Sequence, residues 1–68
     1  MKNKQQRTMI AEAAISLLRD GILKDSKTKI LAAYDIVEDE NFSWIDLDVC
    51  YMEWEELIDE ANQILNEL

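Results

Sequence analysis

The sequence lacks histidine and proline, and it contains a single glycine and a single cysteine. Without histidine, no side chain has an ordinary pKa near neutrality, so acid–base and triad-type catalysis have little support. One cysteine cannot form an internal disulfide, and one thiol without histidine is a poor zinc site. One glycine cannot build a glycine-rich phosphate-binding loop. We therefore expect no enzyme activity, no catalytic residues, no cofactor and no metal site.

The chain is short and has no long apolar run. Its 68 residues suffice for one domain with a small core. The N-terminal stretch starts basic and turns apolar, as a signal peptide does, but Glu12 interrupts it and no small-residue cleavage site follows. No segment approaches the roughly 20 apolar residues of a membrane span. We expect a cytoplasmic protein that does not enter a membrane, stabilised by helix packing or by self-association.

Positive charge is missing from the second half of the chain. All seven basic residues lie within residues 1–29 beside three acids, so that part carries 7 − 3 = +4. Residues 30–68 hold the other twelve acids and no base, which gives −12 and the net charge of −8. Ten of these carboxylates fall within residues 38–60. Such asymmetry bears on partners and solubility, and it carries no information on fold.

Apolar residues recur at helical spacing in two segments of the first half. The first segment predicts a helix over residues 4–20 that packs on two neighbours, with Gly21 just beyond as its stop. The second predicts a helix over residues 26–38, with Asp25 or Ser26 as its N-cap. The apolar positions are Ile10, Ala13, Ala14, Leu17 and Leu18 in the first segment and Ile30, Ala33, Tyr34 and Val37 in the second.

The clearest helical pattern lies in the acidic half and predicts a third helix over residues 44–67. Ser43 and Asp46 form a pattern similar to a capping box at its start. An alternation from Ile45 to Tyr51 would suit a strand, but it stops there while the helical series continues. Three helices with short connections predict an all-α fold, a small antiparallel three-helix bundle in one domain, with a homodimer left open. The expected buried face holds Leu47, Cys50, Tyr51, Trp54, Leu57, Ile58, Ala61, Ile64, Leu65 and Leu68.

Aromatic and further apolar side chains gather around the start of this third helix. Four of the five aromatics lie within residues 42–54. Tyr51 and Trp54 fall on the buried face, so we expect them in the core, whereas Trp44 precedes it and is expected at an interface. The opposite side is also apolar there, so either the connection at residues 38–43 or another chain must cover it. The residues on that side are Ile45, Val49 and Met52.

One stretch resembles a known family. The pattern R-x-x-I-x-x-A-A-x-x-L-L-x-x-G, from Arg7 to Gly21, is similar to the first helix of TetR-type repressor DNA-binding domains and covers about a quarter of the chain. The resemblance implies a following helix–turn–helix with its own glycine turn and an aromatic-bearing recognition helix. Residues 22–40 contain no glycine and become acidic where DNA would be contacted. A small DNA-binding regulator that uses the basic half is therefore an alternative, and direct nucleic-acid binding is not our main expectation.

The acidic half and its aromatic centre together predict a protein-binding surface. An acidic helix face can occupy a basic groove that normally holds nucleic acid, because carboxylates replace phosphates and complementary potentials speed association. We hypothesise a small acidic module that blocks or regulates a basic protein or complex, such as one that processes nucleic acid, with the character of a phage-type inhibitor or an immunity protein. An oligomeric structural or adaptor protein, whose two halves neutralise each other, is the alternative. The candidate contacts are Asp39, Glu40, Trp44, Asp48, Met52, Glu56, Asp59 and Glu60.

Overall fold

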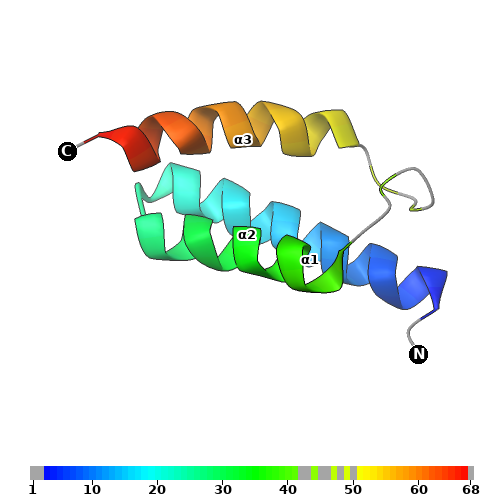
Figure 1. The fold of residues 1–68 in the computed structure, drawn as a ribbon. Coiled ribbons are helices and arrows are strands. Elements are labelled where there is room, and N and C mark those ends of the chain that lie inside the picture. Colours follow the sequence, from blue (N-terminus) through cyan, green and yellow to red (C-terminus); the bar gives the residue numbers. More distant parts are fainter. Residues whose placement is uncertain (1–2, 42–43, 45–46, 48, 50, 68) are drawn as a thin grey trace.

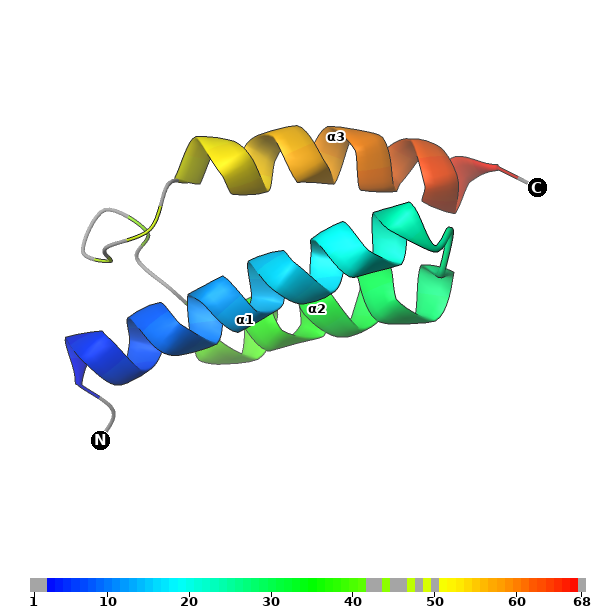
Figure 2. The ribbon, with the colours of Figure 1, turned by 180° about the vertical axis from the view of Figure 1, so that it is seen from behind.

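The three segments of helical periodicity form three helices in a computed structural model, which describes residues 3–41, 44, 47, 49 and 51–67. Helix α1 spans Lys4–Leu23, α2 spans Lys27–Glu40 and α3 spans Tyr51–Asn66. Consecutive helices run in opposite directions, and α3 lies over the pair formed by α1 and α2 (Figure 1), an arrangement that the view from behind repeats (Figure 2). The predicted all-α antiparallel three-helix bundle is confirmed.

The core forms where α1 meets both other helices. Leu18 of α1 and Ile30 of α2 are fully buried, and burying such a side chain contributes about 1.5–3 kcal/mol. Helix α1 packs on α2 and on α3, as its broad apolar face predicts, whereas α2 and α3 make few contacts with each other. Ala13, which the predicted face includes, is exposed. The buried residues of this core are Ala14, Ile15, Leu18, Ile30, Ala33, Trp54 and Ala61.

The end of α1 differs from the sequence prediction. Gly21 does not stop the helix: α1 continues to Leu23, and Asp25 adopts the left-handed backbone conformation, with φ of 53°. The N–H groups of Asp25 and Ser26 donate to the carbonyls of Ile22 and Gly21 at 3.2 and 2.7 Å, respectively. These two bonds make a Schellman motif. The prediction of a glycine stop was wrong because aspartate tolerates the left-handed conformation that glycine usually fills.

Polar residues cap the first two helices. Asn3 and Gln6 form a capping box at the start of α1, with bonds of 2.8 and 3.0 Å to each other's backbone N–H. The hydroxyl of Ser26 accepts a bond from a backbone N–H in the first turn of α2, so the predicted cap is confirmed. Helix α2 runs to Glu40, two residues past its predicted end, and Asn41 closes it in the left-handed conformation. These caps satisfy groups that a helix end leaves without partners.

Helix α3 begins at Tyr51, so the predicted start at residue 44 was wrong. The carbonyl of Trp44 accepts a bond from the N–H of Leu47 at 3.1 Å, which marks a tight turn. Leu47 is only 6% exposed and Val49 packs against the core, both from an irregular connection. Leu47 and Val49 are two residues apart, yet both pack inward, whereas a helix here would have put Val49 on its outer side, as predicted. Other residues of the predicted helix start lie outside the described residues, namely Ser43, Ile45, Asp46 and Cys50.

The buried face of α3 is the predicted one except at Tyr51, the first residue of the helix. Trp54 and Ala61 are buried, and Leu57 and Ile58 are half-buried against the core. Tyr51 is 40% exposed, so its predicted burial was wrong. As the first residue of α3, Tyr51 lies at the end of the bundle, where fewer side chains can cover it.

Candidate functional site

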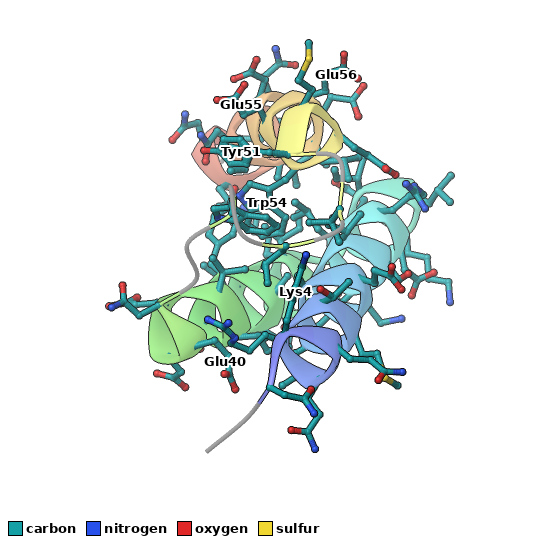
Figure 3. All side chains as sticks on the ribbon, turned by 90° about the vertical axis from the view of Figure 1, so that its right-hand side faces the viewer. Lys4, Glu40, Tyr51, Trp54, Glu55 and Glu56 are labelled. Carbon is teal, nitrogen blue, oxygen red and sulfur yellow. The ribbon has the colours of Figure 1, made fainter. Side chains whose placement is uncertain are left out.

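The outer side of α3 brings together four of the eight predicted contact residues. At 100° per residue they project away from the buried Trp54 and Ala61, and all four are exposed. Figure 3 shows Glu55 and Glu56 pointing away from the bundle. Met52 lies in the first turn of α3, on the same side, and is 67% exposed. We call this surface the acidic face; it consists of Met52, Glu55, Glu56, Asp59 and Glu60.

The remaining predicted acids do not share that face. Asp39 and Glu40 lie in the last turn of α2. Figure 3 shows Glu40 on the opposite side of the molecule from Glu55 and Glu56. Asp48 lies outside the described residues. Helical spacing groups residues within one helix, but it does not say how one helix is turned relative to another, so the predicted set divides between two surfaces.

Trp44 packs beneath the start of α3 within an aromatic cluster. Its ring stacks on Trp54 at 5.6 Å between centroids and tilts against Tyr51 at 5.2 Å. Tyr34 of α2 meets Trp54 edge to face at 6.1 Å. Such pairs contribute about 0.5–1.5 kcal/mol each beyond their buried area. Trp44 is half-buried here, so its position combines packing with partial exposure, and its predicted role at an interface stays a prediction.

Two basic side chains tie α3 to the rest of the bundle. Arg19 of α1 forms an ion pair with Glu53 on the flank of α3. Lys27, the first residue of α2, donates to the backbone carbonyl of Glu67 at 2.8 Å and so joins the start of α2 to the end of α3. Within the part of the chain that the structure describes, no acid of the acidic face takes part in an ion pair. The acidic face therefore keeps its charge toward solvent.

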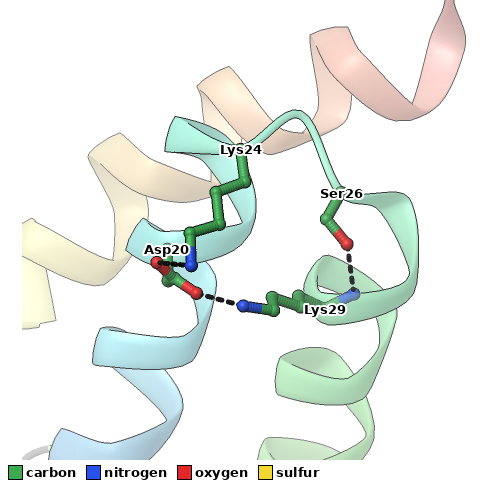
Figure 4. Close-up of polar contacts among 4 residues, drawn as sticks. All are labelled: Asp20, Lys24, Ser26 and Lys29. Carbon is green, nitrogen blue, oxygen red and sulfur yellow. Dashed lines mark hydrogen bonds and ion pairs between the residues drawn. The ribbon is translucent and has the colours of Figure 1, made fainter.

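Two further basic side chains lie near Asp20, at the turn between α1 and α2 (Figure 4). Lys29 donates to one carboxylate oxygen of Asp20, and Lys24 lies 3.4 Å from the other. The hydrogen bond from Lys29 holds the pKa of Asp20 below its ordinary value, and the same bond raises the pKa of Lys29. The two shifts agree in cause and direction. Because these groups are open to solvent, the ion pairs add little stability.

We expect Asp20→Asn to lower the melting temperature slightly at neutral pH and to have no effect in strong acid. The pKa of Asp20 is lowered by folding, so its stabilisation is present above the ordinary carboxyl value of about 4 and is lost as the pH falls through the folded value. Circular dichroism melts from neutral to acid pH measure this. Asp35→Asn is the control, since Asp35 is exposed and makes no ion pair within residues 3–41. Equal pH profiles for the two variants would contradict the assignment.

A groove between α2 and α3 was not predicted from the sequence. Its volume is about 370 Å³, and it exists because these two helices make few contacts with each other. A second hollow of about 430 Å³ shares Ile58 with it and continues toward the start of α3. Tyr34 was predicted on the apolar face of its helix, but no sequence signal said that this side of the bundle would stay open. The groove is lined by Tyr34, Val37, Glu38, Trp54, Ile58 and Asn62, and the second hollow by Tyr51, Glu55, Ile58 and Asp59.

A side-chain hydrogen bond joins the two walls of the groove. The Tyr34 hydroxyl donates to Oδ1 of Asn62 at 3.1 Å, which links α2 to α3. Partial burial raises the pKa of Tyr34, so the hydroxyl stays neutral at physiological pH.

In the described ranges, no three carboxylate or thiol side chains converge as a metal site would require. Among the same residues, no helix has the length and apolar character needed to cross a bilayer.

Comparisons with known families and proteins identify no relative of this chain. No family model, no curated protein and no solved structure matches the chain.

Proposed function

We propose that this protein is a small acidic binding module that blocks or regulates a basic macromolecular partner, such as a protein that handles nucleic acid. The acidic face carries the proposal. It presents four exposed carboxylates on two turns of α3, beside the exposed Met52 in the first turn. Protein interfaces combine apolar side chains, methionine among them, with polar and charged groups at their edges. Carboxylates at this density can take the place of phosphates in a basic groove.

The positions of the basic residues support this function over the two alternatives. Lys24 and Lys29 contact Asp20, Arg19 contacts Glu53, and Lys4 also has an interaction partner. A DNA-binding surface needs cations that displace counterions, and Arg19, Lys24 and Lys29 already have carboxylate partners. Within the described part of the chain, no ion pair joins a basic residue to an acid of the acidic face, so the basic half does not neutralise that face within one chain.

We expect Glu56→Lys to weaken capture of a basic partner about fivefold to tenfold, because it removes an attraction and adds a repulsion worth about 1–1.4 kcal/mol in total. The tagged chain is incubated with host lysate at low and high salt, and captured proteins are identified by mass spectrometry. Capture of a nucleic-acid-handling protein that high salt or added DNA removes would support the proposal.

Asp39→Lys is the matched control for this experiment. It makes the same change in net charge, from −8 to −6, but it lies on α2, away from the acidic face. Equal loss of capture in both variants would mean that only the total charge matters. If neither variant affects capture, the acidic face is not the binding surface.

Self-association is a second candidate with an observation of its own. Large apolar side chains are exposed on α1, where Met9 is 62% and Leu23 is 79% exposed. These two residues lie on the same outer side of α1. An oligomeric adaptor would cover them. Sedimentation of the purified chain over a range of concentrations distinguishes this candidate, since a monomer at every concentration removes it.

A further inference from the structure

The bundle is only loosely closed on the side between α2 and α3. Helix α1 packs on both neighbours, but α2 and α3 touch each other little. The α2–α3 groove and the second hollow follow this side and are joined through Ile58. Toward one end the two helices are joined, because Tyr34 donates to Asn62 and Lys27 donates to the carbonyl of Glu67. Beyond Tyr34, toward Val37 and Trp54, this side is a groove that a further helix can occupy.

The floor of this side is apolar and incompletely covered. Val37 and Ile58 are half-buried, and the buried Trp54 lines the groove with them. An apolar floor of this kind receives an amphipathic helix through residues spaced at i, i+3, i+4 and i+7.

The rim of the same side is acidic. Glu38 lines it from α2, and Glu55 and Asp59 line it from α3. The described residues that line the groove and the second hollow include no lysine or arginine. An occupant with acidic flanks would meet repulsion from both walls, whereas one with basic flanks would meet attraction from both. Charge complementarity therefore selects the occupant.

We propose that the α2–α3 groove binds a basic amphipathic helix of the partner protein, which completes a four-helix arrangement. This inference rests on the proposed function and names the part of the partner that is recognised. The apolar side of the incoming helix lies on Val37 and Ile58, and its lysines or arginines lie beside Glu38, Glu55 and Asp59. The acidic face then continues the contact beyond the groove, because Glu55 and Asp59 belong to both surfaces.

The probe is a fluorescein-labelled synthetic peptide of about 18 residues, long enough to be partly helical alone. Leucines occupy one helical face and lysines the rest. Fluorescence anisotropy measures its dissociation constant for the full chain. We expect it to bind at least about tenfold more tightly than a scrambled peptide of the same composition, because scrambling keeps the charge and destroys the apolar face. Equal affinities would overturn the inference.

Two neighbouring residues of α2 provide matched variants. Glu38→Lys changes the groove wall, and Asp39→Lys makes the same charge change on a residue that does not line the groove. We expect Glu38→Lys to weaken peptide binding about tenfold and Asp39→Lys to leave it within about twofold. Equal effects would mean that binding depends on the net charge of the chain and not on the groove wall, and they would overturn the inference.

The outcomes separate this inference from the proposed function. If Glu56→Lys weakens capture of the natural partner and Glu38→Lys does not, the proposed function stands and the groove is not the docking site. If Glu38→Lys weakens peptide binding while the lysate yields no basic partner, the groove binds as inferred and the proposed function fails. Sedimentation tests the remaining possible occupant, a second copy of this chain. A dimer that Glu38→Lys converts to monomer would place that copy in the groove and overturn the inference.

Discussion

Trp54→Ala is expected to leave the chain largely unfolded at room temperature. Trp54 is 4% exposed, and its ring contacts Tyr34 from α2 and Trp44 from the connection. Truncating a buried tryptophan costs about 3–5 kcal/mol. The core of a domain this small rarely supplies more than about 3–5 kcal/mol of stability. The loss is therefore comparable to the whole stability, and far-ultraviolet circular dichroism should show a large loss of helix.

Tyr51→Ala is the control for Trp54→Ala. It also removes an aromatic side chain from α3, but not one that is buried in the core. Tyr51 belongs to the same helix and also contacts Trp44, but it is 40% exposed. Its truncation should cost about 1 kcal/mol and leave a cooperative thermal transition. If Trp54→Ala unfolds cooperatively with a loss no greater than that of Tyr51→Ala, Trp54 is not the side chain that holds α3 on the other two helices.

Local sequence patterns predicted the helices well and their ends less well. Helical periodicity and the Ser26 cap located α2, because both depend on residues close in sequence. Trp44 and Leu47 are at helical spacing, yet these two residues and Val49 pack inward from positions before the start of α3. Only contacts with distant parts of the chain, such as the stacking of Trp44 on Trp54, separate these two arrangements.

The candidate site shows the same division between local and tertiary information. The carboxylates of α3 share a face because of the helical period alone, so the sequence was sufficient to group Glu56, Asp59 and Glu60. The groove depends on how closely α2 approaches α3, which follows from the packing of both on α1. Glu38 therefore carried no sequence signal that distinguished it from Asp39, although only Glu38 lines the groove.

Gly21→Leu is expected to destabilise the protein by about 3 kcal/mol, even though leucine favours helix over glycine by nearly 1 kcal/mol. Gly21 lies inside α1 and is buried against the start of α2. A Cβ atom on it would lie 3.0 Å from Cγ1 of Ile30 and 3.1 Å from both the Ile30 nitrogen and Cβ of Lys29. Two of these atoms belong to the fully buried Ile30, so they cannot move without disturbing the core.

Whether Gly21→Leu stabilises or destabilises the protein shows why glycine occupies this position. If glycine served only as a helix stop, or were merely tolerated, leucine would stabilise α1, and chemical denaturation would show a gain of up to about 1 kcal/mol. Ala13→Gly, at an exposed position of the same helix, measures the cost of glycine without any packing change and should lose about 1 kcal/mol. Gly21→Ala should fall between wild type and Gly21→Leu, because its methyl group makes the close contacts but adds nothing beyond them. A graded loss across this series would mean that the missing side chain allows α1 and α2 to approach, and that this approach holds Leu18 and Ile30 together in the core.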